Sequence, residues 1–389
     1  MRRIVALAIR ADVPYRIVPG VYEVLSGAVS ISHIREVDVA DLLGREQVTL
    51  DTEAITRFLK GKRVLVTGAG GSIGSEIVRQ VCGFAPARVV LLGRGENSLF
   101  EAENSVMADF PDIPYDTVVA DVRDRDKMRK VFESFAPQVI FHAAAHKHVP
   151  MMEKNPDQAV LNNIGGTRIM TELALEYGVE RFVNISTDKA VNPTSVMGAT
   201  KRIAEMVVRD AASRVKDGHS FVSVRFGNVL GSRGSMLPLF MEQIKAGVPI
   251  TVTHKDIIRY FMAIPEAVGL VFKAASMAKG GEVMVLDMGQ PVRIYDFAQK
   301  LVKYYGDGRS QVIVTGLRPG EKLYEELLAN KDTTIATEDS LVFKARVSNH
   351  ELSELTFLNH YLTTFQSGSP QEMLRMLHEL VPEFNSPKM

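Results

Sequence analysis

The chain of 389 residues is too long for one small hydrophobic core and fits one large domain or two of medium size. Its 46 Lys and Arg residues are balanced by 46 Asp and Glu residues, which excludes a general attraction to nucleic acid or to an anionic membrane, so an anionic ligand needs a local cluster of cations. The single cysteine, Cys82, excludes an internal disulfide and favours a reducing compartment, and we expect a cytoplasmic protein.

Residues 1–60 are predicted to form an N-terminal appendage and linker. Short apolar runs there are interrupted by Pro14, Pro19 and Gly20, a pattern typical of short strands and turns, and a short helix is expected to end near Lys60. The charged start has too short an apolar stretch for a signal peptide. No apolar run approaches the ~20 residues of a membrane-spanning helix, so we expect no membrane segment in this chain.

Residues 61–231 have a regular pattern in which apolar runs of strand length alternate with helical stretches. Because the runs are nearly continuous in apolar residues, they indicate parallel strands that are buried on both faces. The predicted fold class is therefore α/β, with a doubly wound parallel sheet of the Rossmann type. The expected strands cover residues 63–67, 88–92, 115–119, 138–142, 181–186 and 221–225.

The first of these strands runs directly into a glycine-rich turn that opens a helix. Gly68, Gly71 and Gly74 have the spacing Thr-Gly-x-x-Gly-x-x-Gly. Such a turn lets the backbone approach a pyrophosphate, which then lies on the free N–H groups of Ser72, Ile73 and Gly74. Since strand, turn and helix follow in this order, the sequence predicts a dinucleotide-binding site rather than an ordinary loop.

The group that contacts the adenosine ribose is expected at the end of the second strand. An Asp there would bind the 2′-hydroxyl group, but the sequence has Arg94, which favours the 2′-phosphate of NADP; stacking on adenine, which is compatible with NAD, is the alternative. Asp121 is placed either to contact adenine or to cap the next helix. The other candidate cofactor contacts are Asn97, Ser98, Val122, Ala143, Ala144, Ala145, Asn163 and Phe226.

Three histidines, His142, His146 and His148, follow the fourth strand closely. They raise the question of a metal site, but no acid or cysteine completes a ligand set at suitable spacing. The segment also lies where the cofactor is expected to pass. We therefore predict no metal site.

Residues 232–345 are predicted to form mainly a smaller, substrate-binding lobe, with some strands returning to the sheet. The regular alternation of strands and helices is lost after Gly231. Residues 346–389 are expected to be a helical tail, because apolar side chains recur there at helical spacing, at Met373, Met376, Leu377 and Leu380.

Several motifs resemble a known family. Ser186-Thr-Asp-Lys-Ala190 ends the fifth strand and Met197-Gly-Ala-Thr-Lys201 opens the next helix, at the edge of the sheet where ligands bind. With the glycine turn, His142-Ala-Ala-Ala145 and Asn163, they resemble the extended short-chain dehydrogenases/reductases. Arg225-Phe-Gly-Asn-Val-Leu-Gly-Ser-Arg233 and Arg318-Pro-Gly-Glu-Lys322 resemble the UDP-N-acetylglucosamine 4,6-dehydratases of bacterial polysaccharide and glycan biosynthesis. The resemblance covers about residues 35–345, and residues 15–46 resemble the stretch that precedes the catalytic domain in the membrane-anchored forms.

The resemblance implies a net dehydration with a tightly bound NADP or NAD: hydride leaves sugar C4, water is lost across C5 and C6, and hydride returns to C6. It assigns Lys189 as the base at C5 and Asp188 as the acid for the C6 hydroxyl group. Thr187 is expected to contact the C4 oxygen and Lys201 the nicotinamide ribose. Burial near other cations is expected to lower the pKa of Lys189.

Met197 is the main departure from the family at large, which places a catalytic tyrosine four residues before the lysine. A methionine cannot accept a proton, so the acceptor of the C4 hydroxyl proton stays open. The larger, membrane-anchored dehydratases share this methionine, and the resemblance to them implies an active enzyme that retains the configuration at C5.

The resemblance also implies a UDP-sugar as partner and a homo-oligomer. The substrate contacts that it implies are Lys147, His148, Asn228, Arg233, Arg259, Arg318 and Glu321, with Arg318 on the diphosphate and Glu321 on the uridine ribose. Three alternatives remain: a UDP-sugar 4-epimerase, an inverting dehydratase, and a non-catalytic NADP-binding regulator, the last motivated by Met197.

Overall fold

The computed structural model describes residues 52–305, 310–326, 334–346 and 369–385. Most of the predicted N-terminal appendage therefore lies outside the described residues. Its last part forms helix α4 (Thr52–Leu59), which buries Ile55, Phe58 and Leu59 against the main core. The helix ends just before Lys60, where the sequence placed its end.

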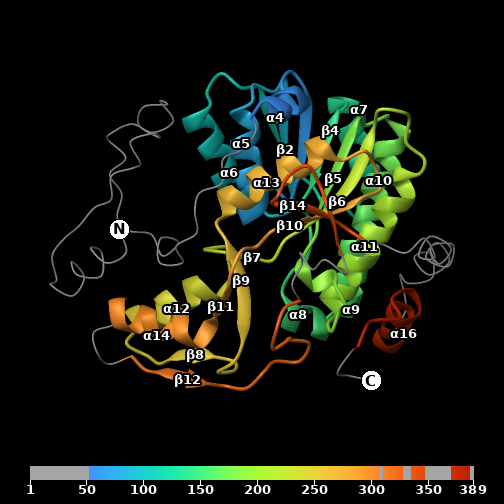
Figure 1. The fold of residues 1–389 in the computed structure, drawn as a ribbon. Coiled ribbons are helices and arrows are strands. Elements are labelled where there is room, and N and C mark those ends of the chain that lie inside the picture. Colours follow the sequence, from blue (N-terminus) through green and yellow to red (C-terminus); the bar gives the residue numbers. More distant parts are fainter. Residues whose placement is uncertain (1–51, 306–309, 327–333, 347–368, 386–389) are drawn as a thin grey trace.

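The main sheet has nine strands in the order β13-β14-β10-β6-β5-β4-β1-β2-β3 (Figure 1). The seven strands from β3 to β10 are parallel, β14 is antiparallel to β10, and β13 is antiparallel to β14. This arrangement confirms the predicted doubly wound Rossmann sheet. The strands are β1 (Arg63–Thr67), β2 (Arg88–Gly93), β3 (Tyr115–Val119), β4 (Val139–His142), β5 (Arg181–Ile185), β6 (Ser220–Arg225), β10 (Val283–Leu286), β13 (Thr334–Ala336) and β14 (Val342–Ala345).

Helices cover both faces of this sheet, because alternate strand residues point to opposite sides. Val64 and Val66 of β1 belong to one core, whereas Leu65 between them belongs to another. The first core is closed by α4, α5 (Ser72–Cys82), α6 (Glu96–Asp109) and α13 (Ile264–Met277), and the second by α7 (Arg125–Phe135), α10 (Thr167–Glu176) and α11 (Val196–Ala212).

A smaller lobe lies beside the carboxyl edge of the sheet and has its own core, which includes Leu237, Phe240 and Leu301 (Figure 1). Within residues 232–345 the chain joins the main sheet twice, first through α13 and β10 before it re-enters the lobe at β11, and again through β13 and β14. The lobe consists of β7 (Asn228–Val229), α12 (Met236–Lys245), β8 (Ile250–Val252), β9 (Ile258–Met262), β11 (Pro291–Arg293), α14 (Ile294–Tyr305) and β12 (Val312–Val314).

The remaining helices pack around the start of α11. They are α8 (Val149–Lys154), α9 (Pro156–Ala159), the π-helix η2 (Val160–Gly166), the short 3-10 helix η3 (Asp188–Ala190) and the C-terminal α16 (Pro370–Leu380). The four apolar side chains expected at helical spacing in the tail are buried in α16, in one core with Met197 and Val207 of α11. Within the described ranges, no helix combines the length and the hydropathy that crossing a membrane requires.

Candidate active site

A cavity of about 890 Å³ opens between the carboxyl ends of the central strands and the lobe. It brings together most of the side chains that the sequence singled out. Those from the sheet side are Gly68, Gly71, Ser72, Ile73, Gly74, Ala143, Ala145, Lys147, His148, Thr187, Lys189, Met197, Lys201 and Phe226. Those from the lobe and its connections are Asn228, Arg233, Arg259, Arg318 and Glu321.

The glycine turn fits a pyrophosphate group. Gly68 has a φ of +67°, and a Cβ on it would lie 2.8 Å from the backbone of Ala143. A Cβ on Gly74 would lie only 2.1 Å from the carbonyl oxygen of Gly68, so the turn and α5 pack backbone to backbone. No side chain caps the first turn of α5, whose first three residues line the cavity. Free N–H donors at a helix start are suited to hold an anion.

The residues expected around adenosine lie outside this cavity. Arg94, whose side chain is 55% exposed, lies 3.9 Å from the Asp121 carboxylate. Arg123, which the sequence analysis did not single out, binds the same carboxylate at 2.8 Å. Burial alone would raise the pKa of Asp121, but its bonds with Arg123 lower it. The first turn of α6 carries Asn97, which is exposed, and Ser98, whose hydroxyl group donates to the Gly95 carbonyl.

Asn163 does not line the cavity but binds the backbone of His146, which does. Its side-chain oxygen accepts from the backbone N–H of His146 at 2.8 Å, and its amide nitrogen donates to the His146 carbonyl and to Thr200 Oγ1, both at 3.0 Å. Ala144 donates its N–H to Thr67, and Val122 is buried beside Gly166. Asn163, Ala144 and Val122 therefore shape the loop after β4 and its surroundings, and none of the three lines the cavity.

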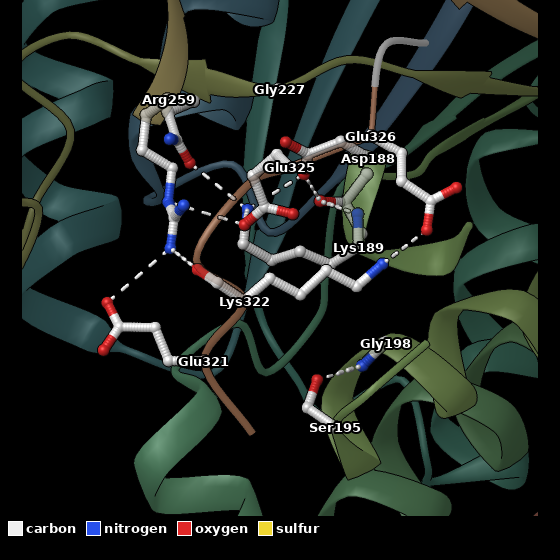
Figure 2. A network of polar contacts seen from close by, with 12 residues as sticks. Asp188, Lys189, Ser195, Gly198, Gly227, Arg259, Glu321, Lys322, Glu325 and Glu326 are labelled. Atoms are coloured by element: carbon white, nitrogen blue, oxygen red, sulfur yellow. Dashed lines mark hydrogen bonds and ion pairs between the residues drawn. The ribbon is translucent and has the colours of Figure 1, made fainter. Parts of the chain in front are cut away.

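The motif after β5 places Thr187, Asp188 and Lys189 in direct contact, and Figure 2 shows Asp188 beside Lys189. The Thr187 hydroxyl group donates to Asp188 Oδ1 at 2.8 Å, and Lys189 Nζ donates to the same oxygen at 2.9 Å. Asp188 is 2% exposed, and its second oxygen, Oδ2, has no hydrogen-bond partner among the described residues. Lys189 Nζ also lies 3.3 Å from Asn228 Oδ1 and 3.3 Å from Glu325 Oε1.

Lys189 and Lys201, two of the lysines that line the cavity, differ in charge environment. Burial alone would lower the pKa of Lys189, but Asp188 and Glu325 outweigh it, so this pKa is raised and not lowered as the sequence suggested. Asp188 has the larger of these two effects on the pKa, and Glu325, which is distant in the chain, adds to it. Burial lowers the pKa of Lys201 to about 8, against the opposing effect of Glu205. Met197 lines the cavity on the same helix and is 3% exposed.

Arg233 lies over the glycine turn. Its guanidinium group donates to the Gly70 carbonyl at 2.9 Å and pairs with Glu101, while its backbone N–H donates to Ser72 Oγ at 3.0 Å. Lys147 Nζ donates to the carbonyl of Arg233 at 3.0 Å. His148 packs under Gly234, where a Cβ would lie 2.7 Å from its ring. The Arg233 loop thus links the lobe to the turn.

Arg259 is 8% exposed, and its guanidinium group donates mainly to backbone carbonyl groups. It donates to the carbonyls of Ile258 and Lys322, both at 2.7 Å, and lies 3.6 Å from Glu321 (Figure 2). Arg318 is exposed and forms no ion pair within the described residues, so its guanidinium group is available to an anion.

Two buried acids at this edge of the sheet were missed by the sequence analysis. Glu325 is 2% exposed on its side chain and touches both Lys189 and Arg259. Its proximity to the Arg318–Lys322 motif was the available signal. Glu205 is bound by Arg225 at 2.5 Å and by the Ser186 hydroxyl group at 2.5 Å, which makes Ser186 a structural residue. In the part of the chain that is described, no group of three His, Cys, Asp or Glu side chains is arranged to hold a metal ion.

A doubly wound sheet, a Thr-Gly-x-x-Gly-x-x-Gly turn and a lysine on the helix after β5 define the class of extended short-chain dehydrogenases/reductases. The comparison with known families is consistent with this class. Residues 64–347 match the family described as polysaccharide biosynthesis protein, and the chain belongs to this family. The resemblance inferred from the motifs is thereby confirmed.

Three individual proteins illustrate the similarity within and around this family. The chain is 52% identical over 335 residues to the probable polysaccharide biosynthesis protein EpsC of Bacillus subtilis, covering 85% of this chain and 55% of EpsC, so it spans about half the length of that relative. It is 31% identical over 282 residues to an inverting UDP-N-acetylglucosamine 4,6-dehydratase of Campylobacter jejuni, covering 71% and 80% of the two chains. The solved structure of Pen from Bacillus thuringiensis is 33% identical, with a TM-score of 0.68, and covers 77% and 99%.

Proposed function

We propose that this protein is a nucleotide-sugar 4,6-dehydratase that converts UDP-N-acetylglucosamine into the UDP-4-keto-6-deoxy sugar. The observation that carries the proposal is the contact of buried Asp188 with Thr187 and Lys189, both of which line the cavity that also contains the glycine turn. An elimination across C5 and C6 needs a base and an acid beside each other, and Lys189 and Asp188 supply them. The dehydratase named among the relatives supports the same reaction.

A nicotinamide dinucleotide bound on the glycine turn would supply the redox chemistry by taking a hydride from C4 and returning it to C6. Gly68, Ser72 and Gly74 would hold its pyrophosphate, and Lys201 its nicotinamide ribose. We propose NADP, because Arg94 stands where an acid would favour NAD. The dinucleotide that is released when the purified protein is denatured identifies the cofactor by mass.

Thr187 and Asp188 offer a route for the C4 hydroxyl proton, which Met197 cannot accept. The Thr187 hydroxyl group already donates to Asp188, so a proton received from C4 at Thr187 Oγ1 can pass to the carboxylate. Protonated Asp188 then gives this proton to the C6 hydroxyl group, which leaves as water. One carboxylate thus serves first as acceptor and then as acid.

Lys189 completes the proton balance. As a neutral amine it takes the C5 proton and returns it to C5 when C6 receives hydride, so Lys189 and Asp188 end the cycle as they began it. The ammonium form of Lys189, which its raised pKa favours, has one proton too many for this role. Activity is therefore expected to increase as pH rises toward the pKa of Lys189.

The experiment that tests the proposal follows UDP-N-acetylglucosamine by mass spectrometry after incubation with the protein. Loss of one water supports a dehydratase, and NMR coupling constants at C5 then separate retention, which we propose, from inversion. An unchanged mass with inverted C4 would identify a 4-epimerase, and a bound but unconverted sugar would identify a non-catalytic regulator; either result contradicts the proposal.

Replacement of Lys189 tests the assigned base. Lys189→Ala and Lys189→Arg are both expected to lose dehydration at least ~100-fold while the dinucleotide remains bound. The arginine variant keeps a cation beside Asp188 and Glu325 but does not release its proton at neutral pH, so it separates base chemistry from charge balance. Lys322→Arg is the matched control, since Lys322 Nζ contacts Val191 and Glu326 instead. Full activity of Lys189→Arg would rule out the assignment.

A further inference from the structure

Glu325 has a buried carboxylate that contacts Lys189. Its Oε1 lies 3.3 Å from Lys189 Nζ and 3.5 Å from Arg259 Nε, so one oxygen touches two cations (Figure 2). Its Oε2 is buried and has no hydrogen-bond partner among the described residues. A β-bridge between Ile258 and Tyr324 fixes the backbone beside it. Glu325 is therefore held in place by the fold and keeps its charge close to Lys189.

Glu325 does not line the large cavity, although residues that it contacts do. It is absent from the wall of the 890 Å³ cavity, whereas Lys189 lines it. It lines a second cavity of about 140 Å³ together with Lys189 and Arg259. An effect of Glu325 on a sugar in the large cavity must therefore act through the residues that it contacts there, Lys189 and Arg259.

The polar groups around Lys189 Nζ come from several different segments of the chain. Asp188 of η3 and Glu325 carry negative charge, Asn228 of β7 supplies a neutral acceptor, and Arg259 of β9 carries positive charge. Glu321 and Arg318 lie further out on the walls of the two cavities that they share with Lys189. Lys189 Nζ donates hydrogen bonds to Asp188 at 2.9 Å and to Asn228 at 3.3 Å, and it forms an ion pair with Glu325 at 3.3 Å.

We propose that Glu325 is a positioning residue that makes Lys189 a stronger base toward the C5 proton, an inference that rests on the proposed dehydration. A second carboxylate beside Nζ stabilises the ammonium ion that forms when the C5 proton arrives, which favours the transfer. It also keeps that proton on Lys189 until it returns to C5. The same charge lowers the fraction of neutral Lys189 at a given pH, so the stronger base is available in fewer molecules.

The test measures the proton on Lys189 without turnover. Wild-type protein and variants are treated with acetic anhydride at one fixed pH, and acetylation of the Lys189 peptide is followed by mass spectrometry. Removal of one nearby negative charge lowers the pKa of a lysine by about one unit or more, so Lys189 in Glu325→Gln is expected to react about three- to tenfold faster. Glu325→Asp keeps the charge one methylene group further away and is expected to give an intermediate rate, which also serves if Glu325→Gln does not fold.

Glu326→Gln is the matched control, because Glu326 lies next in the chain and contacts Lys322 and Asn192 instead of Lys189. It is expected to leave the Lys189 rate at the wild-type value. Equal rates in wild type and Glu325→Gln, or equal acceleration by Glu326→Gln, would overturn the inference. In assays of turnover, Glu325→Gln is expected to move the rising limb of the kcat profile to lower pH and to lower its plateau severalfold, whereas a merely structural role would leave the limb in place.

The proposed function and the inference about Glu325 can be contradicted independently of each other. If Glu325→Gln accelerates the acetylation of Lys189 but wild-type protein removes no water from UDP-N-acetylglucosamine, the control of Lys189 by Glu325 stands and the proposed substrate or reaction falls. If water is removed but acetylation does not respond to Glu325, the proposed function stands and the inference about Glu325 falls.

Discussion

Lys189 and Lys201 line the same cavity, yet their surroundings shift their pKa values in opposite directions. Lys189 lies between two carboxylates that stabilise its charge, whereas burial dominates at Lys201. At neutral pH both are expected to be protonated in the ligand-free protein, and Lys201 loses its proton first as the pH rises through about 8. An assignment of the base by pKa alone would therefore select Lys201, and the contact with Asp188 and Thr187 argues for Lys189 instead.

Met197 provides a test at the residue scale. If Thr187 and Asp188 take the C4 hydroxyl proton, the thioether has only to fill its place in the cavity wall, and a side chain of similar volume should serve. Met197→Leu is expected to retain dehydration within about threefold of wild type, measured as water loss from the sugar. Thr187→Val, which removes the hydroxyl group but keeps the shape, is expected to lose at least ~100-fold. Equal activities of the two variants would contradict the proton route.

Some properties of single residues could not be predicted from the sequence. The motifs located Asp188 and Lys189, because both follow a recognisable strand end. The raised pKa of Lys189 was not predicted from burial: it results from Asp188, the adjacent residue, together with Glu325, which a β-bridge from the lobe brings close. Arg233 lines the cavity, but its contact with the Gly70 carbonyl was not predicted, because nothing in a local pattern tells which way a loop folds back.

The glycine turn provides a test at the scale of an element. A Cβ on Gly74 would meet the carbonyl oxygen of Gly68 at 2.1 Å, so Gly74→Ala must push α5 away from β1 and open the turn. The purified variant is expected to lose most of its bound dinucleotide, measured by absorbance after denaturation. Gly165→Ala is the control, since its Cβ would approach only the Val160 carbonyl, at 3.9 Å, and it should keep the wild-type content. Full cofactor content in Gly74→Ala would contradict the role of the turn.

The six strands from β3 to β6 of the main sheet were predicted from the sequence, whereas β10, β13, β14 and the strands of the lobe were not. Most of the predicted strands are nearly continuous apolar runs, because a parallel strand covered on both faces needs such side chains. The edge strand β3 is only partly buried and also contains Asp116 and Thr117. The lobe strands are as short as β7, Asn228–Val229, and partly exposed, so their sequence carries little periodic signal. Their pairing joins distant segments, as when β11 pairs with β9 across α13 and β10.

Glu205 provides a test at the scale of the whole molecule. It is buried on α11 and binds Arg225 of β6 and Ser186 after β5, while Arg202 links it to Glu383 near the C-terminal end. Glu205→Gln leaves buried cations uncompensated and is expected to lower the free energy of unfolding by about 3 to 5 kcal/mol, measured by urea unfolding. Glu176→Gln removes an exposed partner of Arg129 and is expected to leave the free energy of unfolding close to the wild-type value.

The stabilisation by Glu205 should also depend on pH. Burial alone would raise the pKa of Glu205, but Arg225 and Arg202 outweigh it and hold this pKa below its usual value. The contribution is therefore fully present at neutral pH and is lost as pH falls below the usual range of a glutamate. If wild type and Glu205→Gln differ by the same amount at neutral and at strongly acidic pH, the assigned charge interaction is wrong.

The lobe has its own hydrophobic core, separate from the two that pack against the main sheet. Substitutions around Leu237 or Phe240 therefore leave the packing beneath the glycine turn and the β5 motif undisturbed. Under the proposed function, natural variation or protein engineering in the lobe would alter the chemical group admitted beside Lys189, while the residues proposed to move protons stay unchanged. Such modularity would give one scaffold a physical route to accept different sugars.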